Sequence, residues 1–129
     1  MKLSYLKTKT AVLWWNLDEI ERDIERSRFV VELKRMLVVN LVGLYTLEDV
    51  DWTKVDVSIP PIVASLGADK YCVLSGGEQI EKARLLGFKT LRCFFLKPSQ
   101  HKRYIIDYDE EIYRRAVSEY WEEDEDDWK

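Results

Sequence analysis

Two consecutive glycines separate an apolar segment from an amphipathic one in YCVLSGGEQIEKARLLGFKT, residues 71–90. The pattern predicts a strand, a tight turn and then a helix. N–H groups at the start of a helix attract anions, and glycine lets a phosphate approach closely. The alternative is a tight connection that binds nothing, with a first-turn glutamate that only stabilises its helix. The residues expected to bind phosphate are Ser75, Gly76, Gly77, Glu78 and Gln79.

Basic residues follow this turn without a carboxylate between Lys82 and Arg103, although the whole chain has a net charge of −4. The segment carries seven cations and His101. Such a run favours an anionic partner, nucleic acid or a nucleotide, and the alternative is a solvated surface whose charges merely cluster. The candidate contacts to nucleic acid are Lys89, Arg92, Lys97, Lys102 and Arg103.

Other side chains offer weaker chemistry. Glu78 is the candidate catalytic carboxylate, and a run of acids over 107–111 has the ligands that Mg²⁺ prefers, although helix capping explains most of them equally well. His101 is expected to be a solvated loop residue, and Tyr104 is a candidate for stacking on a base. Two cysteines and one histidine are too few for a four-ligand zinc site.

The composition predicts one ordinary domain over residues 1–121, followed by an acidic tail over 122–129 that frays into solvent. The chain has 129 residues and 47% hydrophobic content, and it lacks an apolar run of the roughly 20 residues that a membrane span needs. Its start lacks the apolar run of a signal peptide, so a cytoplasmic location is expected. A charged content of 34% with few amide side chains favours a thermophilic source.

The order of the expected elements predicts an α+β fold, with a small mixed sheet and flanking helices. These elements are a strand at 10–15, a helix at 18–37, hairpin strands at 61–65 and 71–75, a helix at 78–86 and a strand at 90–96. Residues 38–45 fit either a strand or the end of the long helix, and we favour the helix end.

The C-terminal part is expected to contain a loop at 97–100, a strand or extended arm at 103–108, and a last helix capped by Asp109. The inward-facing residues of the helices are expected to be Ile80, Ala83 and Leu86 in the helix at 78–86, and Ile112, Ala116 and Tyr120 in the last helix. Cys72 and Cys93 fall on two strands that bracket a helix, so either a disulfide or two buried thiols fit the pattern.

Part of this pattern resembles the ParB/sulfiredoxin-like fold. The resemblance covers roughly residues 59–97, from P-I-V through Y-x-V-L-S-G to a helix that ends in L-L-G-F-K-T. Gly76 matches the first turn glycine of the family and Gly87 its helix-end glycine, and the spacing between them fits without a gap. The resemblance implies a ParB-like fold with a site at the turn.

The side chains that carry the chemistry of this family are not retained. The nucleophilic cysteine of sulfiredoxins falls at Glu78, and a carboxylate cannot attack as a thiolate does. The glutamate and paired arginines that handle phosphates in ParB-like domains fall at Gly77, Glu78 and Gln79. The resemblance therefore implies a fold and the location of a site, and it leaves open whether the chain is an enzyme.

Three functions fit these observations. The first is a ParB-like module that binds nucleic acid or a nucleotide phosphate at the 75–79 turn and the basic 82–103 segment. The second is a phosphoryl-transfer enzyme or nuclease of the same fold, which would use Mg²⁺ with a nucleotide. The third is a protein-interaction module that uses its acidic tail. The sequence indicates no oligomeric state.

The tail generates a first prediction. Deleting residues 122–129 removes six carboxylates and one lysine and changes the net charge from −4 to +1. If the tail screens the basic segment, the truncated chain should bind a DNA or RNA oligonucleotide more tightly than the full chain at low salt. Fluorescence anisotropy measures the two affinities, and equal values would contradict a screening role.

Overall fold

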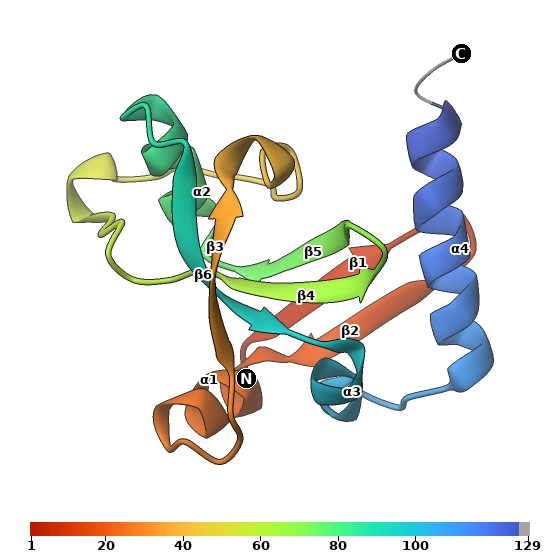
Figure 1. Cartoon of the computed structure of the whole chain (residues 1–129). Helices are drawn as coiled ribbons and strands as arrows, with labels where there is room; N and C mark the ends of the chain where they lie inside the picture. Colours follow the sequence, from red (N-terminus) through yellow and green to blue (C-terminus); the bar gives the residue numbers. More distant parts are fainter. Residues whose placement is uncertain (127–129) are drawn as a thin grey trace. The chain divides into compact units, whose positions relative to one another are not determined.

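The computed structural model describes residues 1–126, with side chains as far as Tyr120, and it is shown in Figure 1. Two compact units make up this part of the chain. Residues 30–97 form the first, here called the sheet unit, and residues 1–29 with those from Pro98 onward form the second, the hairpin unit. Each unit contains one β-sheet, so the α+β class is confirmed. The single domain over 1–121 stays a prediction.

The sheet unit is built on four strands in the order β3-β6-β4-β5. Their bounds are Glu32–Leu37 for β3, Ile62–Gly67 for β4, Lys70–Ser75 for β5 and Thr90–Leu96 for β6. β6 pairs antiparallel with β3 and parallel with β4, and β4 pairs antiparallel with β5. The expected hairpin and the strand at 90–96 are confirmed.

Helix α2 (Gly77–Leu85) connects β5 to β6 and supplies part of one apolar core. Ile80 and Ala83 of α2 are fully buried there, as expected. Leu86 is 57% exposed, so its expected inward position is wrong. The reason is that α2 ends at Leu85, and Leu86 begins the turn that follows. The buried residues of this core are Met36, Val38, Leu41, Val63, Ile80, Ala83, Leu91 and Cys93.

Gly87 ends α2, as the sequence indicates. Its backbone is left-handed, with a φ of 81°. The Gly87 N–H donates to the Arg84 carbonyl at 3.0 Å and the Phe88 N–H to the Ala83 carbonyl at 2.9 Å. This pair of bonds is the Schellman motif, which satisfies carbonyls that the helix leaves unpaired at its end.

The expectation of one helix over 18–37 is wrong. Helix α1 covers only Leu17–Glu25, and Ser27 adopts a left-handed backbone that ends it. Residues 32–37 form β3, which pairs with β6 along its full length. The apolar spacing at 31, 33 and 37 fits an alternating strand as well as a drifting helical face, and the distant pairing decides between them. A 3₁₀ turn, η1 (Val38–Asn40), follows β3 in place of the expected helix end.

The hairpin unit contains an antiparallel pair of strands, β1 (Leu3–Lys7) and β2 (Val12–Asn16). β2 was expected, whereas β1 had no clear sequence signal. Residues 97–104 do not form a loop and strand as expected. They contain helix α3 (Pro98–His101) and a 3₁₀ turn, η3 (Lys102–Tyr104). Residue Ile105 then forms an isolated bridge with Trp15, which is all that remains of the expected strand at 103–108.

Helix α4 (Glu110–Asp126) begins at the expected cap, because Asp109 Oδ1 accepts the Ile112 N–H at 3.0 Å. Ala116 is buried as expected, but Tyr113 takes the inward position that was expected for Ile112. The expected fraying from residue 121 is wrong for 121–126, which are helical. The last residues of the acidic tail, 127–129, lie outside the described residues.

The two cysteines are free and buried. Cys72 lies on β5 and Cys93 on β6, and β4 runs between these strands, so of the two alternatives the structure has two buried thiols. Two strand spacings amount to about 10 Å, which is beyond the roughly 7 Å that a disulfide can bridge between Cα atoms. Burial raises the pKa of each thiol to about 12, so both stay protonated and unreactive at neutral pH.

A second prediction concerns the contact between α4 and the turn that joins β1 to β2. Glu119 accepts hydrogen bonds from the Thr10 hydroxyl, from the Thr8 hydroxyl at 2.6 Å and from the Thr10 N–H at 2.9 Å. These bonds lower the pKa of Glu119 from 4.5 to about 2. Because the folded pKa lies below the unfolded one, the stabilisation is complete above about pH 4.5 and declines as the pH falls toward 2.

We therefore expect Glu119→Gln to lower the midpoint of thermal unfolding at pH 6, and this difference from the parent chain should shrink toward zero at pH 2. Circular dichroism melts at several pH values measure it. Glu111→Gln on the same helix is the matched control, because Glu111 is exposed and makes no described side-chain hydrogen bond. A deficit that is independent of pH would contradict the assigned role of the Glu119 carboxylate.

Candidate functional site

The predicted phosphate turn lies between β5 and α2 in the sheet unit. Gly76 adopts a left-handed backbone with a φ of 91° and directly precedes the first helical residue, Gly77. The first bond of the helix runs from the Ile80 N–H to the Gly76 carbonyl at 3.2 Å. The N–H groups at 77–79 therefore have no acceptor within the helix, and the helix dipole favours an anion beside them.

Packing accounts for both glycines without a ligand. A Cβ atom at Gly76 would lie 2.7 Å from the Pro61 Cα, and one at Gly77 would lie 2.8 Å from the Tyr45 Cβ. Both distances are too short for a real contact, and the left-handed φ of Gly76 independently favours glycine. The space that the missing side chains leave is occupied by Pro61 and Tyr45. The phosphate site at this turn stays a prediction.

Two buried oxygen atoms beside the turn lack a hydrogen-bond partner among the described residues: the Tyr45 hydroxyl and Gln79 Oε1. Burial also raises the pKa of Tyr45. Unpaired buried polar atoms cost about 1–3 kcal/mol each, so a small polar molecule that paired with them would stabilise this region. An anion could pair with the tyrosine hydroxyl directly, but it would need Gln79 to present its NH₂ group instead of its oxygen.

Most charged residues of α2 make contacts that stabilise the fold. Glu78, the candidate catalytic carboxylate, is exposed in the first turn and makes no described side-chain hydrogen bond. Glu81 forms an ion pair with Arg84 one turn later. Lys82 donates to the carbonyls of Trp52 at 2.8 Å and Val55 at 2.7 Å, which holds the connection that contains η2 (Trp52–Lys54). No described group is positioned to make Glu78 a general base.

The five predicted nucleic-acid contacts are divided between the two units. Lys89, Arg92 and Lys97 belong to the sheet unit, and Lys102 and Arg103 to the hairpin unit. Within the hairpin unit, Lys102 Nζ lies 4.5 Å from the centre of the Tyr113 ring, and the guanidinium of Arg103 lies 5.6 Å from that of Phe29. Both cations therefore pack on aromatic rings of their own unit.

A second arginine, which the sequence analysis did not single out, lies across the sheet from Arg92. Arg35 of β3 stands directly opposite Arg92 in the β3–β6 register, and both side chains are exposed. Opposite residues share one face of a sheet, so the two guanidinium groups lie on the same side. Arg35 donates to the Thr90 hydroxyl at 3.3 Å, and no carboxylate among the described side chains, 1–120, pairs with either arginine. The spacing of Val31, Leu33 and Leu37 at odd positions was the available signal, but it also fitted the helix that the sequence analysis favoured.

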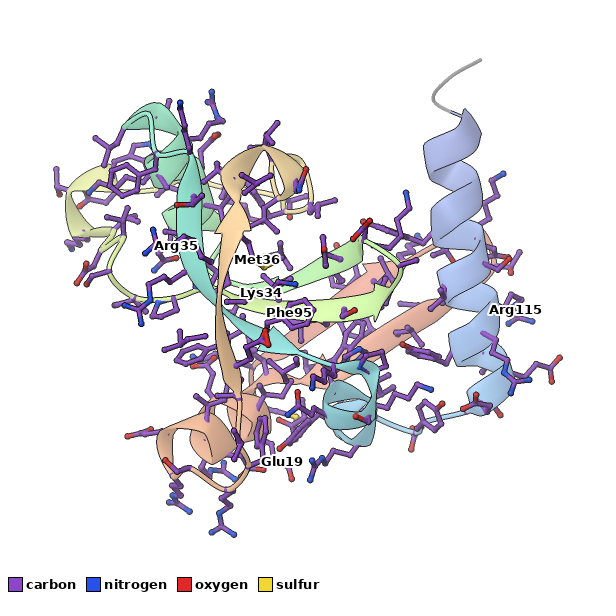
Figure 2. The ribbon with its side chains drawn as sticks, in the orientation of Figure 1. Glu19, Lys34, Arg35, Met36, Phe95 and Arg115 are labelled. Atoms are coloured by element: carbon purple, nitrogen blue, oxygen red, sulfur yellow. The ribbon has the colours of Figure 1, made fainter. Side chains whose placement is uncertain are left out.

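Apolar side chains flank these arginines on the same face. Leu33 and Leu37 lie two residues before and after Arg35, and they are 44% and 51% exposed. Phe94 pairs with Leu33 and is half-buried. We call this surface the arginine face, and its residues are Leu33, Arg35, Leu37, Thr90, Arg92 and Phe94. The other face of the same strands carries Lys34, whose Nζ lies 4.4 Å from the centre of the Phe95 ring. Both side chains are labelled in Figure 2.

His101 and Tyr104 are buried, so both expectations for them are wrong. Trp15 donates its indole N–H to His101 Nδ1 at 3.2 Å, which places the imidazole hydrogen on Nε2 and makes the ring neutral. The Tyr104 hydroxyl donates to Asp23 at 2.8 Å. Burial, reinforced by this bond, raises the pKa of Tyr104 to about 12. A ring that is 3% exposed cannot stack on a base.

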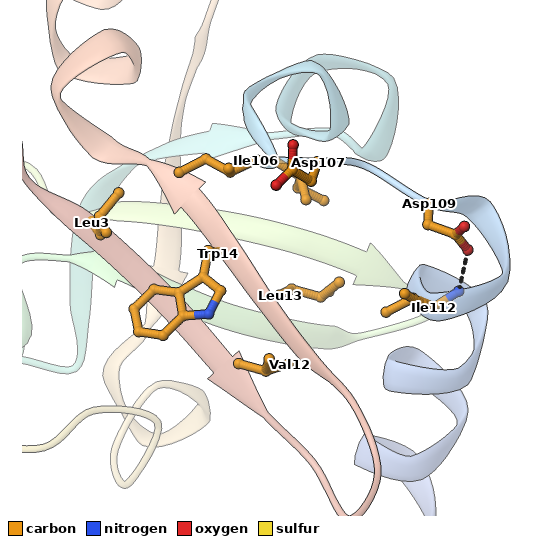
Figure 3. Close-up of a pocket in the computed structure, with 9 residues that line it drawn as sticks. Leu3, Val12, Leu13, Trp14, Ile106, Asp107, Asp109 and Ile112 are labelled. Carbon is orange, nitrogen blue, oxygen red and sulfur yellow. Dashed lines mark hydrogen bonds between the residues drawn. The ribbon is translucent and has the colours of Figure 1, made fainter.

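A cleft of about 440 Å³ opens in the hairpin unit (Figure 3). Its lining is apolar except for Asp107 and Asp109, and the strands contribute Leu3, Val12 and Trp14 to it. Among the described residues, no group of three or more histidines, cysteines or acids is arranged to hold a metal ion. The acids at 107–111 are dispersed instead: Asp109 caps α4, and Glu110 bonds to the Tyr108 hydroxyl.

Comparisons with known proteins do not place the chain in a family. No protein-family model matches it, and searches of curated proteins and of solved structures found no significant match. The ParB/sulfiredoxin-like resemblance therefore stays a prediction. Within residues 1–126, no helix combines the length and the apolar character that crossing a membrane requires.

A third prediction tests the turn. Inorganic phosphate at millimolar concentration should shift the NMR amide signals of Gly76 and Gly77 first, because their N–H groups lie at the start of α2. Gly87 is the internal control: it is also left-handed, but it lies at the end of the same helix, where the dipole disfavours an anion. Equal shifts at Gly76 and Gly87, or none at the turn, would rule out the site.

Proposed function

We propose that this chain binds nucleic acid through the arginine face of its sheet unit. The observation that carries the proposal is the Arg35–Arg92 pair, two exposed cations fixed opposite each other with no described carboxylate beside them. Like charges directly opposite in a sheet destabilise it. Two unit charges about 5 Å apart in water repel by about 1 kcal/mol, and an anion that contacts both removes this repulsion.

The neighbours of the pair support a polynucleotide over a single small anion. Leu33, Leu37 and the half-buried Phe94 give the same face apolar surface beside its charges. Surfaces that bind single strands combine cations for the backbone with apolar and aromatic side chains for the bases. We therefore expect single-stranded nucleic acid to bind more tightly than inorganic phosphate, and without base-specific hydrogen bonds.

Two backbone contacts fix the strands that carry this surface. The Val38 N–H donates to the Lys89 carbonyl at 2.9 Å, which holds the backbone of Lys89 at one end of the β3–β6 pair. Pro61 contacts both the arginine-bearing strand and the glycine turn: its carbonyl accepts the Phe94 N–H at 2.8 Å, and its Cα adjoins Gly76. Pro61 therefore joins β6 to the glycine turn, whereas α2 itself packs on the face of β6 that carries Leu91 and Cys93, opposite the arginine face.

A fourth prediction tests the proposal through its salt dependence. Each phosphate contact contributes about −0.7 to the slope of log affinity against log salt for a single strand. Arg35→Gln and Arg92→Gln should each make the slope less negative by about 0.7 and weaken binding at low salt. Anisotropy of a labelled single-stranded oligonucleotide, titrated at several KCl concentrations, gives both quantities.

Arg26→Gln is the matched control, because it makes the same change in net charge at an exposed position of the hairpin unit. It should leave the slope unchanged, and an equal loss from all three variants would overturn the proposal. The melting temperature distinguishes lost contacts from lost structure. Arg35→Gln relieves a like-charge contact, so this variant should unfold at the same or a slightly higher temperature.

A further inference from the structure

The outer face of the β1–β2 pair in the hairpin unit carries four apolar or aromatic side chains together with Lys7 and Asn16. Tyr5 and Trp14 stand opposite each other across the strands, and their ring centres are 5.1 Å apart. Leu3 and Val12 lie on the same face because side chains alternate along a strand. Each of these four side chains is at least 40% exposed, although Leu13 and Trp15 on the inner face are buried. Exposed apolar groups gathered on one face indicate a binding surface.

This face forms one wall of the cleft of about 440 Å³ in Figure 3. Trp14 lies on the strand side, and Ile106 and Ile112 come from the segment that enters α4. The Ile106 N–H donates to the Trp14 carbonyl at 2.8 Å, which fixes that segment against β2. The volume lies within the range of about 300–1,000 Å³ that is typical of small-molecule sites.

The charged side chains that line the cleft are all acidic. No lysine or arginine lines it, and its two charged side chains are Asp107 and Asp109. One oxygen of Asp109 accepts the Ile112 N–H and caps α4. Asp107 is exposed and has no hydrogen bond or ion pair in the described chain. One carboxylate at an apolar cleft therefore lacks a counter-ion.

We propose that this cleft binds a small organic cation, an ammonium group carried on an apolar body. The body would contact Ile106 and the Trp14 ring, and the ammonium would pair with Asp107. The face of an indole ring attracts cations as well as apolar groups, so Trp14 suits both parts of such a ligand. An anion would meet repulsion from Asp107, and a divalent metal would find one free carboxylate where it needs several oxygen ligands.

The test uses three probes of similar size and different charge: 2-phenylethylammonium, 2-phenylethanol and 3-phenylpropionate. NMR titration of the full chain follows the indole N–H signal of Trp14 and the methyl signals of Ile106 and Ile112. The ammonium should bind saturably at up to about 10 mM, the alcohol more weakly and the carboxylate most weakly. Asp107→Asn should lower the affinity for the ammonium by about fivefold and leave that for the alcohol unchanged.

Asp69→Asn is the matched control. Asp69 and Asp107 are both exposed aspartates with left-handed backbones, at φ values of 55° and 51°. Asparagine adopts this conformation as readily as aspartate, so both variants should fold. Asp69→Asn should bind the ammonium as the parent chain does. Equal binding of the three probes, no saturable binding, or an equal loss in both variants would overturn the proposal. A short peptide of leucine and lysine serves as a fourth probe, and binding of this peptide without binding of 2-phenylethylammonium would also overturn it.

Discussion

The pairing of β6 with two different strands determines most of the sheet unit. β6 runs antiparallel to β3 on one side and parallel to β4 on the other. The first pairing places Arg35 opposite Arg92, and the second brings Pro61 and the glycine turn to the same strand. It also closes the apolar core, because Leu91 and Cys93 of β6 join Ile80 of α2 there. The surface proposed for nucleic acid is a consequence of strand register.

The glycine turn shows how a binding motif and a packing constraint can share one sequence pattern. A strand, two glycines and a helix start describe a phosphate-binding turn, and they equally describe a chain that must pass close to Pro61 and Tyr45. The sequence contains both explanations because glycine serves both purposes. Packing explains the two glycines, but it does not explain why the buried oxygens of Tyr45 and Gln79 lack hydrogen-bond partners in the described chain.

The sequence predicted the secondary structure correctly where glycines separate the elements. The hairpin at 62–75, α2 and β6 follow from short apolar runs separated by glycines, and Arg92 follows from its position on β6. Long-range contacts decided what the sequence could not. The sequence of β3 fits a helix as well as a strand, and its pairing with β6, more than 50 residues later in the chain, makes it a strand. His101 lies in a polar segment, and it is buried against Trp15, 86 residues away, and against the Tyr113 ring.

The position of β3 has a consequence for self-association. It is an edge strand of the four-stranded sheet, and exposed edges are templates on which other strands add. Two adjacent cations, Lys34 and Arg35, occupy the middle of β3. An antiparallel copy centred on them would place Lys34 of each chain opposite Arg35 of the other, which like-charge repulsion opposes. Arg35, which repels Arg92 within the sheet, thus also acts with Lys34 to protect the edge against the growth of filaments.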